Sequence, residues 1–222
     1  AEGSGKRAGD TEIPGAQVGG KDIPDLLNAD KHSPASSKKT DENKRKEHFK
    51  MNEIIQCLKD RRSVRKYKKE QVKEEQLAQI LEAGTYAPTG MGMQSPIMVV
   101  VQDAETIAKL SKLNAAVMGV NSDPFYGAPT VIVVLADQSR GTCVEDGSLV
   151  MGNMMNAAHA IGLGSCWVNR AREVFDSDEG KALLKKWGID GNYIGVGNCI
   201  LGYADEKPEM KPRKENYVYY VR

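Results

Sequence analysis

The distribution of apolar and polar residues divides the chain near residue 50. Residues 1–50 are rich in Gly, Ser, Lys, Asp and Pro and contain a single aromatic residue, Phe49. Such a segment buries too little apolar surface to fold alone, so we predict a solvated polar arm or linker, of native or engineered origin. Its short apolar stretches at residues 13–14 and 23–27 could alternatively dock on a partner surface. Residues 51–222 carry the apolar pattern of a folded domain.

Within residues 51–222, apolar residues recur at helical spacing in some segments and form β-branched runs in others. The pattern predicts helices over residues 51–60, 74–83 (with Gly84 as the stop), 105–113, 148–161 and 178–187 (before Gly188). It predicts buried strands over residues 97–102, 129–136 and 193–201, and a short strand over 166–168. The helix over 148–161 is apolar nearly all round, so we expect it to be buried on every side, at the domain centre or a subunit interface. Residues 216–221 have strand propensity, which favours a tail that extends over a neighbour.

Length and charge narrow the class of protein. The 222 residues suit one domain of ordinary size, or one domain plus an appendage. A formal net charge of +1 gives no field that would favour nucleic acid or an anionic membrane as partner. No apolar run approaches the ~20 residues that span a bilayer, and we see no apolar core of an export signal. We therefore expect a cytoplasmic protein that binds neither membrane nor nucleic acid.

The four cysteines, Cys57, Cys143, Cys166 and Cys199, form no C-x-x-C pair and have no histidine at zinc-finger spacing. We interpret them as reduced, mostly buried thiols and expect no metal site.

Two glycine pairs could suggest a phosphate-binding loop. Gly162 and Gly164 follow a predicted helix, whereas Gly195 and Gly197 lie inside a predicted strand. Neither pair has the strand–loop–helix context of a dinucleotide fingerprint, so we expect close backbone approaches or strand-end kinks instead. A phosphate site in this chain must therefore be built from side chains.

The strongest side-chain candidate is the run Arg-Arg-Ser-Val-Arg-Lys-Tyr at residues 61–67. Guanidinium groups are planar forks that match phosphate oxygens. Taken alone, the run is more typical of a solvated basic helix end, where cations complement the helix dipole. A second cationic pair, Lys211 and Arg213, flanks Pro212 in a loop that prolines stiffen.

Two further segments could approach a flat ligand. The link at residues 87–96 is long for a helix–strand connection, and such loops are often functional. In it, Gly90 and Gly92 allow close main-chain approach, and the methionines and Gln94 offer polarizable and hydrogen-bonding contacts. Residues 164–167, Gly-Ser-Cys-Trp, could place backbone amides against a ring, or could simply begin a core strand.

Taken together, these motifs resemble the nitroreductase family of flavin mononucleotide (FMN) enzymes, in the same order and over residues 51–222. The matching motifs are R-x-S-x-[RK]-x-[YF] at 61–67, A-P-T with a later Gln at 87–94, A-P at 128–129, G-L-G before S-C-W at 162–167, and K-P-R at 211–213. The resemblance implies an α+β, three-layer fold with a central, mostly antiparallel sheet flanked by helices. It also implies a homodimer formed through helices, with FMN at the interface.

The same resemblance implies roles for individual residues. Arg61, Ser63 and Arg65 would contact the phosphate, ribityl chain and ring edge, and Lys211 and Arg213 would complete the phosphate site. Residues 88–94 would come from the partner subunit and cover the cofactor. The full expected cofactor-binding set is Arg61, Arg62, Ser63, Arg65, Pro88, Thr89, Gly90, Met91, Gly92, Gln94, Asn121, Ser165, Cys166, Trp167, Lys211 and Arg213. Tyr126 is a candidate substrate-pocket residue, or a core residue.

By this analogy the chain is an NAD(P)H-dependent oxidoreductase that reduces nitroaromatics, quinones or related small-molecule acceptors by a ping-pong mechanism. No catalytic side chain is expected, because the flavin carries the chemistry. Arg65 is the candidate to stabilise the reduced ring. Alternatives are a specialised flavin reaction, such as reductive dehalogenation or flavin fragmentation, and a non-catalytic flavin-binding protein.

The sequence also departs from the family pattern in three places. Gly92 stands where many members have Asn, Ser95-Pro96 stands where Pro-Trp is common, and the link at residues 136–147 lacks the helical insertions of larger members. The missing insertions leave the substrate class open.

Overall fold

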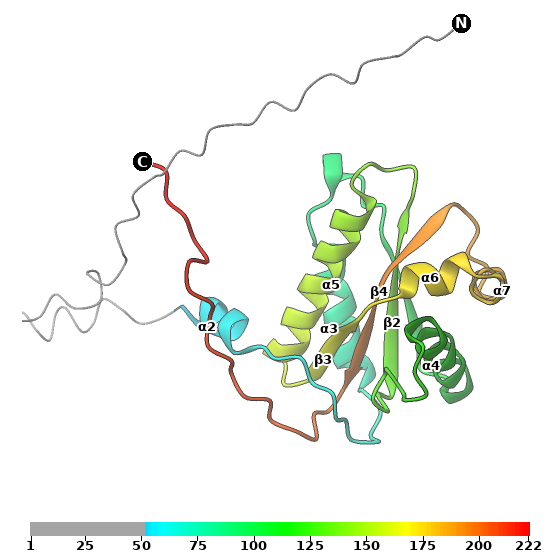
Figure 1. The fold of residues 1–222 in the computed structure, drawn as a ribbon, viewed down its shortest axis with the longest axis horizontal. Helices are drawn as coiled ribbons and strands as arrows, with labels where there is room; N and C mark the ends of the chain where they lie inside the picture. The colour runs from blue at the N-terminus through cyan, green and yellow to red at the C-terminus, as the bar shows by residue number, and fades with distance from the viewer. Residues whose placement is uncertain (1–51) are drawn as a thin grey trace, which may run out of the picture. The chain divides into compact units, whose positions relative to one another are not determined.

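The computed structural model describes residues 52–222, which form an antiparallel sheet with helices on both faces (Figure 1). The arm predicted over residues 1–50 lies outside the described residues. The four strands are β1 (Ile97–Val101), β2 (Thr130–Asp137), β3 (Gly164–Val168) and β4 (Tyr193–Gly202). They are ordered β1-β2-β4-β3, and each neighbouring pair is antiparallel. This arrangement confirms the predicted α+β fold with an antiparallel sheet.

The helices match the apolar periodicity of the sequence, with shifted ends. They are α2 (Glu53–Asp60), α3 (Glu74–Thr85), α4 (Ala104–Met118), α5 (Cys143–Ala160), α6 (Ala171–Asp176) and α7 (Asp178–Lys186), with a short 3-10 turn, η2 (Gly90–Gly92). Side chains at Asn52, Asp103 and Ser177 accept hydrogen bonds from the first turns of α2, α4 and α7 and so fix where these helices begin. Gly188, at φ 69°, ends α7 as expected.

Strand β2 is the centre of the core because both of its faces are covered. Alternate residues, Val131, Val133 and Leu135, pack with α4, α6 and α7. The residues between them, Ile132 and Val134, pack with α3 and α5 on the other face (Figure 1). All five are fully buried, and each such side chain contributes about 1.5–3 kcal/mol to stability. A continuous apolar run is the sequence pattern that such a doubly covered strand requires.

Several predicted boundaries are wrong for packing reasons. Gly84 lies inside α3, where a Cβ would come within 2.8 Å of Met98 Sδ, so this glycine permits close helix–strand packing instead of ending the helix. Strand β1 is a partly buried edge strand. Helix α5 begins five residues before the predicted start at residue 148. Val144 and Leu149 are each 45% exposed on the protomer, so the domain centre does not bury this helix on every side, and its burial at a subunit interface stays a prediction.

Two segments differ in kind from the prediction. Helix α6 was not predicted, because its six residues are too few to show helical periodicity. Residues 216–221 form no strand among the described residues and are exposed. Their expected extension over a neighbour stays a prediction.

Both glycine pairs allow turns or close approaches of the backbone, as expected. Gly162, at φ 83°, directly follows the end of α5, and the Leu163 amide turns back to Ala158 O at 2.8 Å. In β4, a Cβ on Gly195 would overlap the Ala171 carbonyl, and one on Gly197 would come within 2.7 Å of Trp167 Nε1. These are close approaches, so no glycine loop for phosphate is built there.

Candidate functional site

The run at residues 61–67 follows α2 and lies along the outer edge of β3, which is the last strand of the sheet. Ser63 pairs with Ser165 as a parallel bridge, and the Val64 amide donates to Ser165 O at 3.0 Å. Further on, Tyr67 pairs with Ala204, just beyond the end of β4. The structure therefore brings two segments of the predicted site, some hundred residues apart in the chain, into direct contact.

Three buried polar atoms beside this contact have no hydrogen-bond partner among the described residues. They are Arg61 Nη1, Ser165 Oγ and Trp167 Nε1. Ser165 and Trp167 point to the same face of β3, because side chains two residues apart share a face. Leaving a buried donor or acceptor unpaired costs about 1–3 kcal/mol, so such groups usually have a role that requires a partner.

Cys199 locates Arg61 relative to Trp167. Trp167 is the cross-strand neighbour of Cys199 in the β3–β4 ladder. Burial raises the pKa of the Cys199 thiol to about 12, and the positive charge of Arg61 acts in the opposite direction. The positive charge of Arg61 is therefore close enough to lower the pKa of the buried Cys199 thiol, and Cys199 lies directly across from Trp167 in the neighbouring strand.

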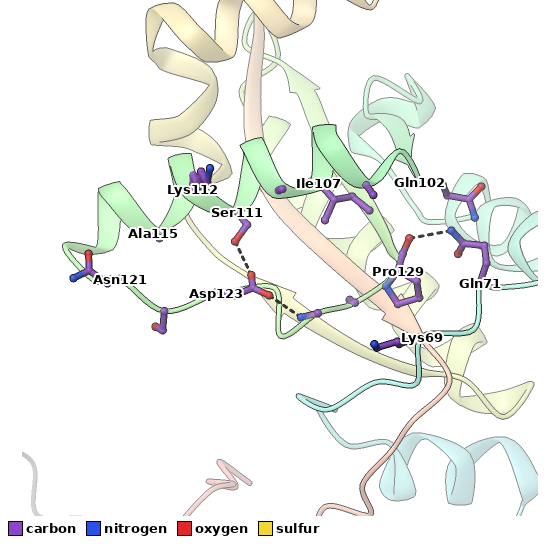
Figure 2. Close-up of a pocket in the computed structure, with 15 residues that line it drawn as sticks. Lys69, Gln71, Gln102, Ile107, Ser111, Lys112, Ala115, Asn121, Asp123 and Pro129 are labelled. Atoms are coloured by element: carbon purple, nitrogen blue, oxygen red, sulfur yellow. Dashed lines mark hydrogen bonds between the residues drawn. The ribbon is translucent and has the colours of Figure 1, made fainter.

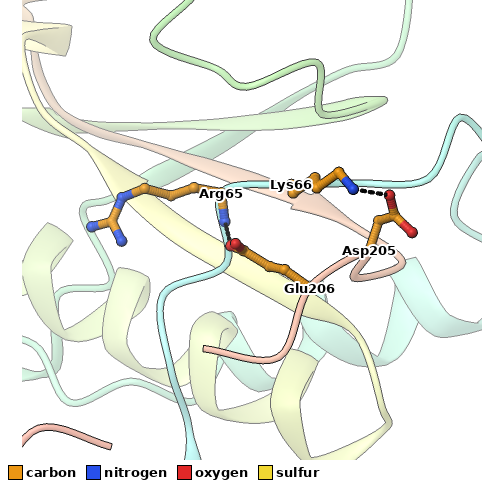
Figure 3. Close-up of polar contacts among 4 residues, drawn as sticks. All are labelled: Arg65, Lys66, Asp205 and Glu206. Carbon is orange, nitrogen blue, oxygen red and sulfur yellow. Dashed lines mark hydrogen bonds and ion pairs between the residues drawn. The ribbon is translucent and has the colours of Figure 1, made fainter. Parts of the chain in front are cut away.

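The other arginines of the run have different surroundings. Arg62 Nη1 donates to Lys59 O at 2.6 Å and to Arg61 O at 2.8 Å, which satisfies carbonyls at the end of α2. The Arg65 amide donates to Glu206 Oε1 at 2.5 Å, while its guanidinium extends away from that carboxylate into solvent (Figure 3). Arg62 therefore caps a helix, whereas the guanidinium of Arg65 has no ion-pair partner among the described residues.

Lys66 forms an exposed ion pair beside this run. Its Nζ lies 2.8 Å from Asp205 Oδ2 (Figure 3). The hydrogen bond and charge of Asp205 raise the pKa of Lys66, and Lys66 in turn lowers the pKa of Asp205. Asp205 and Glu206 therefore clamp residues 65–66 to the segment that follows β4.

Cys166 is separated from its neighbours in the predicted set. Its side chain lies on the other face of β3, in the apolar cluster with Val133 and Phe175. Its Sγ has only a weak contact, 3.6 Å, to Trp167 O. All four cysteines are free, and Cys166 and Cys199 are buried whereas Cys57 and Cys143 are half-buried.

The loop at residues 88–94 contains the 3-10 turn η2 and lies against the start of α5. The Gly90 amide donates to Asp146 Oδ1 at 2.8 Å. Within the loop, the Gln94 amide donates to Thr89 Oγ1 at 3.0 Å. Met91 is 94% exposed, so the loop presents its apolar tip to the outside of the protomer.

The remaining predicted residues lie near two surface cavities. A cavity of about 630 Å³ between α4 and the following loop includes Asn121 in its wall, with Lys69, Gln71 and Asp123 (Figure 2). Asp123 is held there by Ser111 Oγ and by the amides of Phe125 and Gly127, shown in part in Figure 2. Tyr126, at φ 54°, is 43% exposed and is not part of that wall.

The second cavity, of about 750 Å³, joins the basic run to the segment after β4. Arg62 and Val64 line one side, and residues 206–210 line the other. Lys211 and Arg213 follow directly and are exposed, with Arg213 Nη2 donating to Lys211 O at 2.8 Å. The structure thus gathers Arg61, Ser63, Ser165 and Trp167, and leaves Asn121, the loop at 88–94 and the K-P-R pair at other places on the protomer.

Two functional classes have no structural signal in the described part of the chain. No helix in residues 52–222 is long and apolar enough to cross a membrane. The same residues contain no group of three or more His, Cys, Asp or Glu side chains placed to hold a metal ion.

Comparison with known proteins decides the family. The profile of the nitroreductase family matches residues 58–124 and 116–203, which is more than half of the chain. The chain belongs to this family. The resemblance indicated by the ordered motifs is therefore confirmed.

Individual members of the nitroreductase family agree with this assignment. A relative from Archaeoglobus fulgidus, named as a candidate NADH dehydrogenase/NAD(P)H nitroreductase, is 32% identical over 164 residues, covering 71% of this chain and 89% of the relative. The NAD(P)H-dependent FMN reductase of Bacillus subtilis is 25% identical over 185 residues, covering 73% of this chain and 70% of the relative. A nitroreductase of Bacteroides fragilis with bound FMN superposes with a TM-score of 0.72 at 28% identity, covering 78% of this chain and 100% of that chain.

Proposed function

We propose that this nitroreductase-family chain is an FMN-dependent oxidoreductase that takes electrons from NADH or NADPH. The observation that carries the proposal is the set of unpaired buried atoms on Arg61, Ser165 and Trp167, which lie where two family motifs meet. FMN offers what these groups lack: phosphate and ribityl oxygens for a guanidinium and a hydroxyl, and ring acceptors for an N–H donor. The FMN-bound relative from Bacteroides fragilis supports the same cofactor.

Different residues of this chain would bind different parts of FMN. Arg61 and Ser63 would bind phosphate and ribityl oxygens, with Lys211 and Arg213 as further phosphate ligands. Arg65, whose guanidinium has no ion-pair partner among residues 52–222, would place positive charge at the ring edge. Trp167 and Ser165 would face the ring, with Asn121 as an additional ring contact. When bound, FMN supplies the hydride and electron chemistry, so no acid or base side chain is required.

A homodimer is part of the proposal. In the described part of the chain, helix α2 has no buried residue, although Ile54, Ile55 and Leu58 form an apolar face. Exposed apolar side chains also occur on α5, at Val144 and Leu149, and along the tail at residues 217–221. Apolar surface of this extent usually marks an interface. In the dimer, the loop at 88–94 would cover the cofactor of the partner subunit.

For the acceptor we propose nitroaromatics, quinones or related small molecules, reduced by a ping-pong mechanism. Support comes from the direct link at residues 136–147, which runs from β2 into α5 without inserted helices that would wall a selective pocket. A specialised flavin reaction would instead give poor turnover of nitro compounds. A non-catalytic flavin-binding protein would bind FMN without oxidising NAD(P)H.

Titration with FMN tests the site directly. Replacing Arg61 with Met keeps an unbranched apolar side chain but removes the guanidinium cation, and we expect the Kd for FMN to rise about 10- to 100-fold, as for loss of a charge-assisted hydrogen bond. Lys181→Met is the matched control, because it removes an exposed cation from α7, away from the proposed site. Equal FMN affinity for the two variants would overturn the assignment of Arg61.

A further inference from the structure

One carboxylate holds the loop at residues 88–94 in place. Asp146 lies in the first turn of α5 and is 3% exposed. Its Oδ1 accepts the Gly90 amide at 2.8 Å, and its Oδ2 accepts the hydroxyl of Thr142 at 3.2 Å. A buried carboxylate is costly unless its oxygens are satisfied, and here one of the two bonds comes from a loop 56 residues away.

The conformation that this bond holds is unusual. Met91 has φ 55° and Gln94 has φ 50°, both in the left-handed region, with Gly92 at φ 66° between them. Left-handed conformations at residues other than glycine cost about 1 kcal/mol or more each and persist only where surrounding contacts enforce them. The loop therefore needs an anchor outside itself.

The approach of the loop to α5 is also tightly fitted. A Cβ on Gly90 would overlap Thr142 Oγ1, the same hydroxyl that donates to Asp146. Within the loop, Thr89 and Gln94 are joined, because Thr89 Oγ1 accepts a hydrogen bond from the Gln94 amide. Gly90, Thr142 and Asp146 thus form one junction, while Met91 at the tip remains exposed.

We propose that Asp146 is the positioning residue of this loop: by accepting the Gly90 amide, it fixes residues 88–94 in the strained shape that they present to FMN across the dimer interface. The inference rests on the proposed function, in which this loop covers the cofactor. Asp146 itself is buried and acts through Gly90. It lies on α5, so the rigid central helix sets the position of the cover.

The test compares three variants of the full chain. Asp146→Ala removes both accepted bonds. Asp146→Asn keeps an oxygen for the Gly90 amide and offers Nδ2 to Thr142 Oγ1, so it should rescue the junction without the charge. Glu145→Ala removes the neighbouring acidic side chain of the same helical turn, which is exposed, and serves as the matched control.

Two readouts separate the anchor from the flavin site. Hydrogen exchange of residues 88–95, measured in flavin-free protein, should become about tenfold faster or more in Asp146→Ala and stay unchanged in Asp146→Asn and Glu145→Ala. The Kd for FMN, measured by flavin fluorescence well below the melting temperature, should rise about tenfold in Asp146→Ala alone.

Each contrary result overturns a definite part of the proposal. Unchanged hydrogen exchange in Asp146→Ala would show that Asp146 does not fix the loop. Faster exchange with unchanged FMN affinity would show that the position of the loop does not contribute to FMN binding. If Asp146→Asn behaves like Asp146→Ala, the charge matters and the hydrogen bond does not. If the unaltered protein binds no FMN, the proposed function and the cofactor half of the inference both fall, while the exchange data still decide the anchor. Should Asp146→Ala not fold, Thr142→Val gives the same comparison with a smaller effect, about threefold.

Discussion

The run at residues 61–67 holds three arginines with different surroundings: Arg62 caps α2, Arg61 has a buried Nη1 without a partner among the described residues, and Arg65 is exposed. Arg61, Ser63 and the 164–167 segment were selected as candidates because their spacing matches a family pattern, and their roles stay predictions. That Arg62 caps α2 while Arg61 is left with an unpaired buried nitrogen could not be predicted, since both are arginines in one run. Asp146 was missed because the predicted helix began after it. Its only signal was an acidic residue just before an apolar segment.

The buried thiol of Cys199 predicts a specific pH dependence. Burial raises its pKa from 9.0 to about 12. Between these pH values the unfolded chain releases the thiol proton while the folded chain retains it, so the free energy of unfolding falls as pH rises, by up to about 1.4 kcal/mol per pH unit. Below pH 9 both states are protonated and the effect vanishes.

Denaturant unfolding of Cys199→Ala measures this effect. From about pH 8 to about pH 10.5, the variant should lose less stability than the unaltered protein, by roughly 2 kcal/mol. Cys57→Ala, in which the replaced cysteine is only half-buried, should follow the unaltered protein. Parallel pH profiles for all three proteins would show that Cys199 does not carry the dependence.

Gly195 gives a steric prediction of similar precision. A Cβ at this position would overlap the backbone carbonyl of Ala171, which neither strand β4 nor helix α6 can move cheaply. Gly195→Ala should therefore lower the free energy of unfolding by about 1–3 kcal/mol or more. Gly141→Ala, where nothing lies within 4 Å of the added Cβ, should change it by less than about 0.5 kcal/mol. Equal denaturation midpoints would contradict the close approach.

At the scale of elements, strand β2 was predictable because both of its faces are covered and its apolar residues run continuously. The edge strand β1 looked equally apolar, and sequence could not show that fewer elements cover it. Helix α6 was missed because six residues give less than two turns. Gly84 was misread because its role, contact with Met98 and Met154, depends on elements distant in sequence.

Helix α2 carries the element-scale prediction. Ile54, Ile55 and Leu58 on its apolar face stay at least half exposed, so Leu58→Glu should spare the protomer and weaken a dimer, raising the dissociation constant at least about tenfold. Sedimentation velocity over a range of concentrations measures this. Val117→Glu, which places the same charge on an exposed apolar site of α4, is the control. If both variants sediment like the unaltered protein, α2 is not an interface helix.

At the scale of the whole molecule, order along the chain was the informative signal. Each motif alone is also explained by an ordinary structural role. Only the order of the motifs from residue 61 to residue 213 indicated the family, which the family profile then confirmed. The structure adds that the protomer gathers only part of the expected site. In the proposed dimer, the loop at 88–94 would contact the FMN of the partner subunit. The exposed K-P-R pair would contact the phosphate of the bound FMN.

Anaerobic stopped-flow reduction tests the central claim most directly. The purified protein, loaded with FMN, is mixed with NADH or NADPH, and the visible absorbance of the flavin is followed before and after addition of a nitroaromatic or a quinone. We expect the absorbance to bleach with at least one nicotinamide and to return with the acceptor. A protein that takes up no FMN, or whose bound FMN is reduced by neither nicotinamide, would contradict the account.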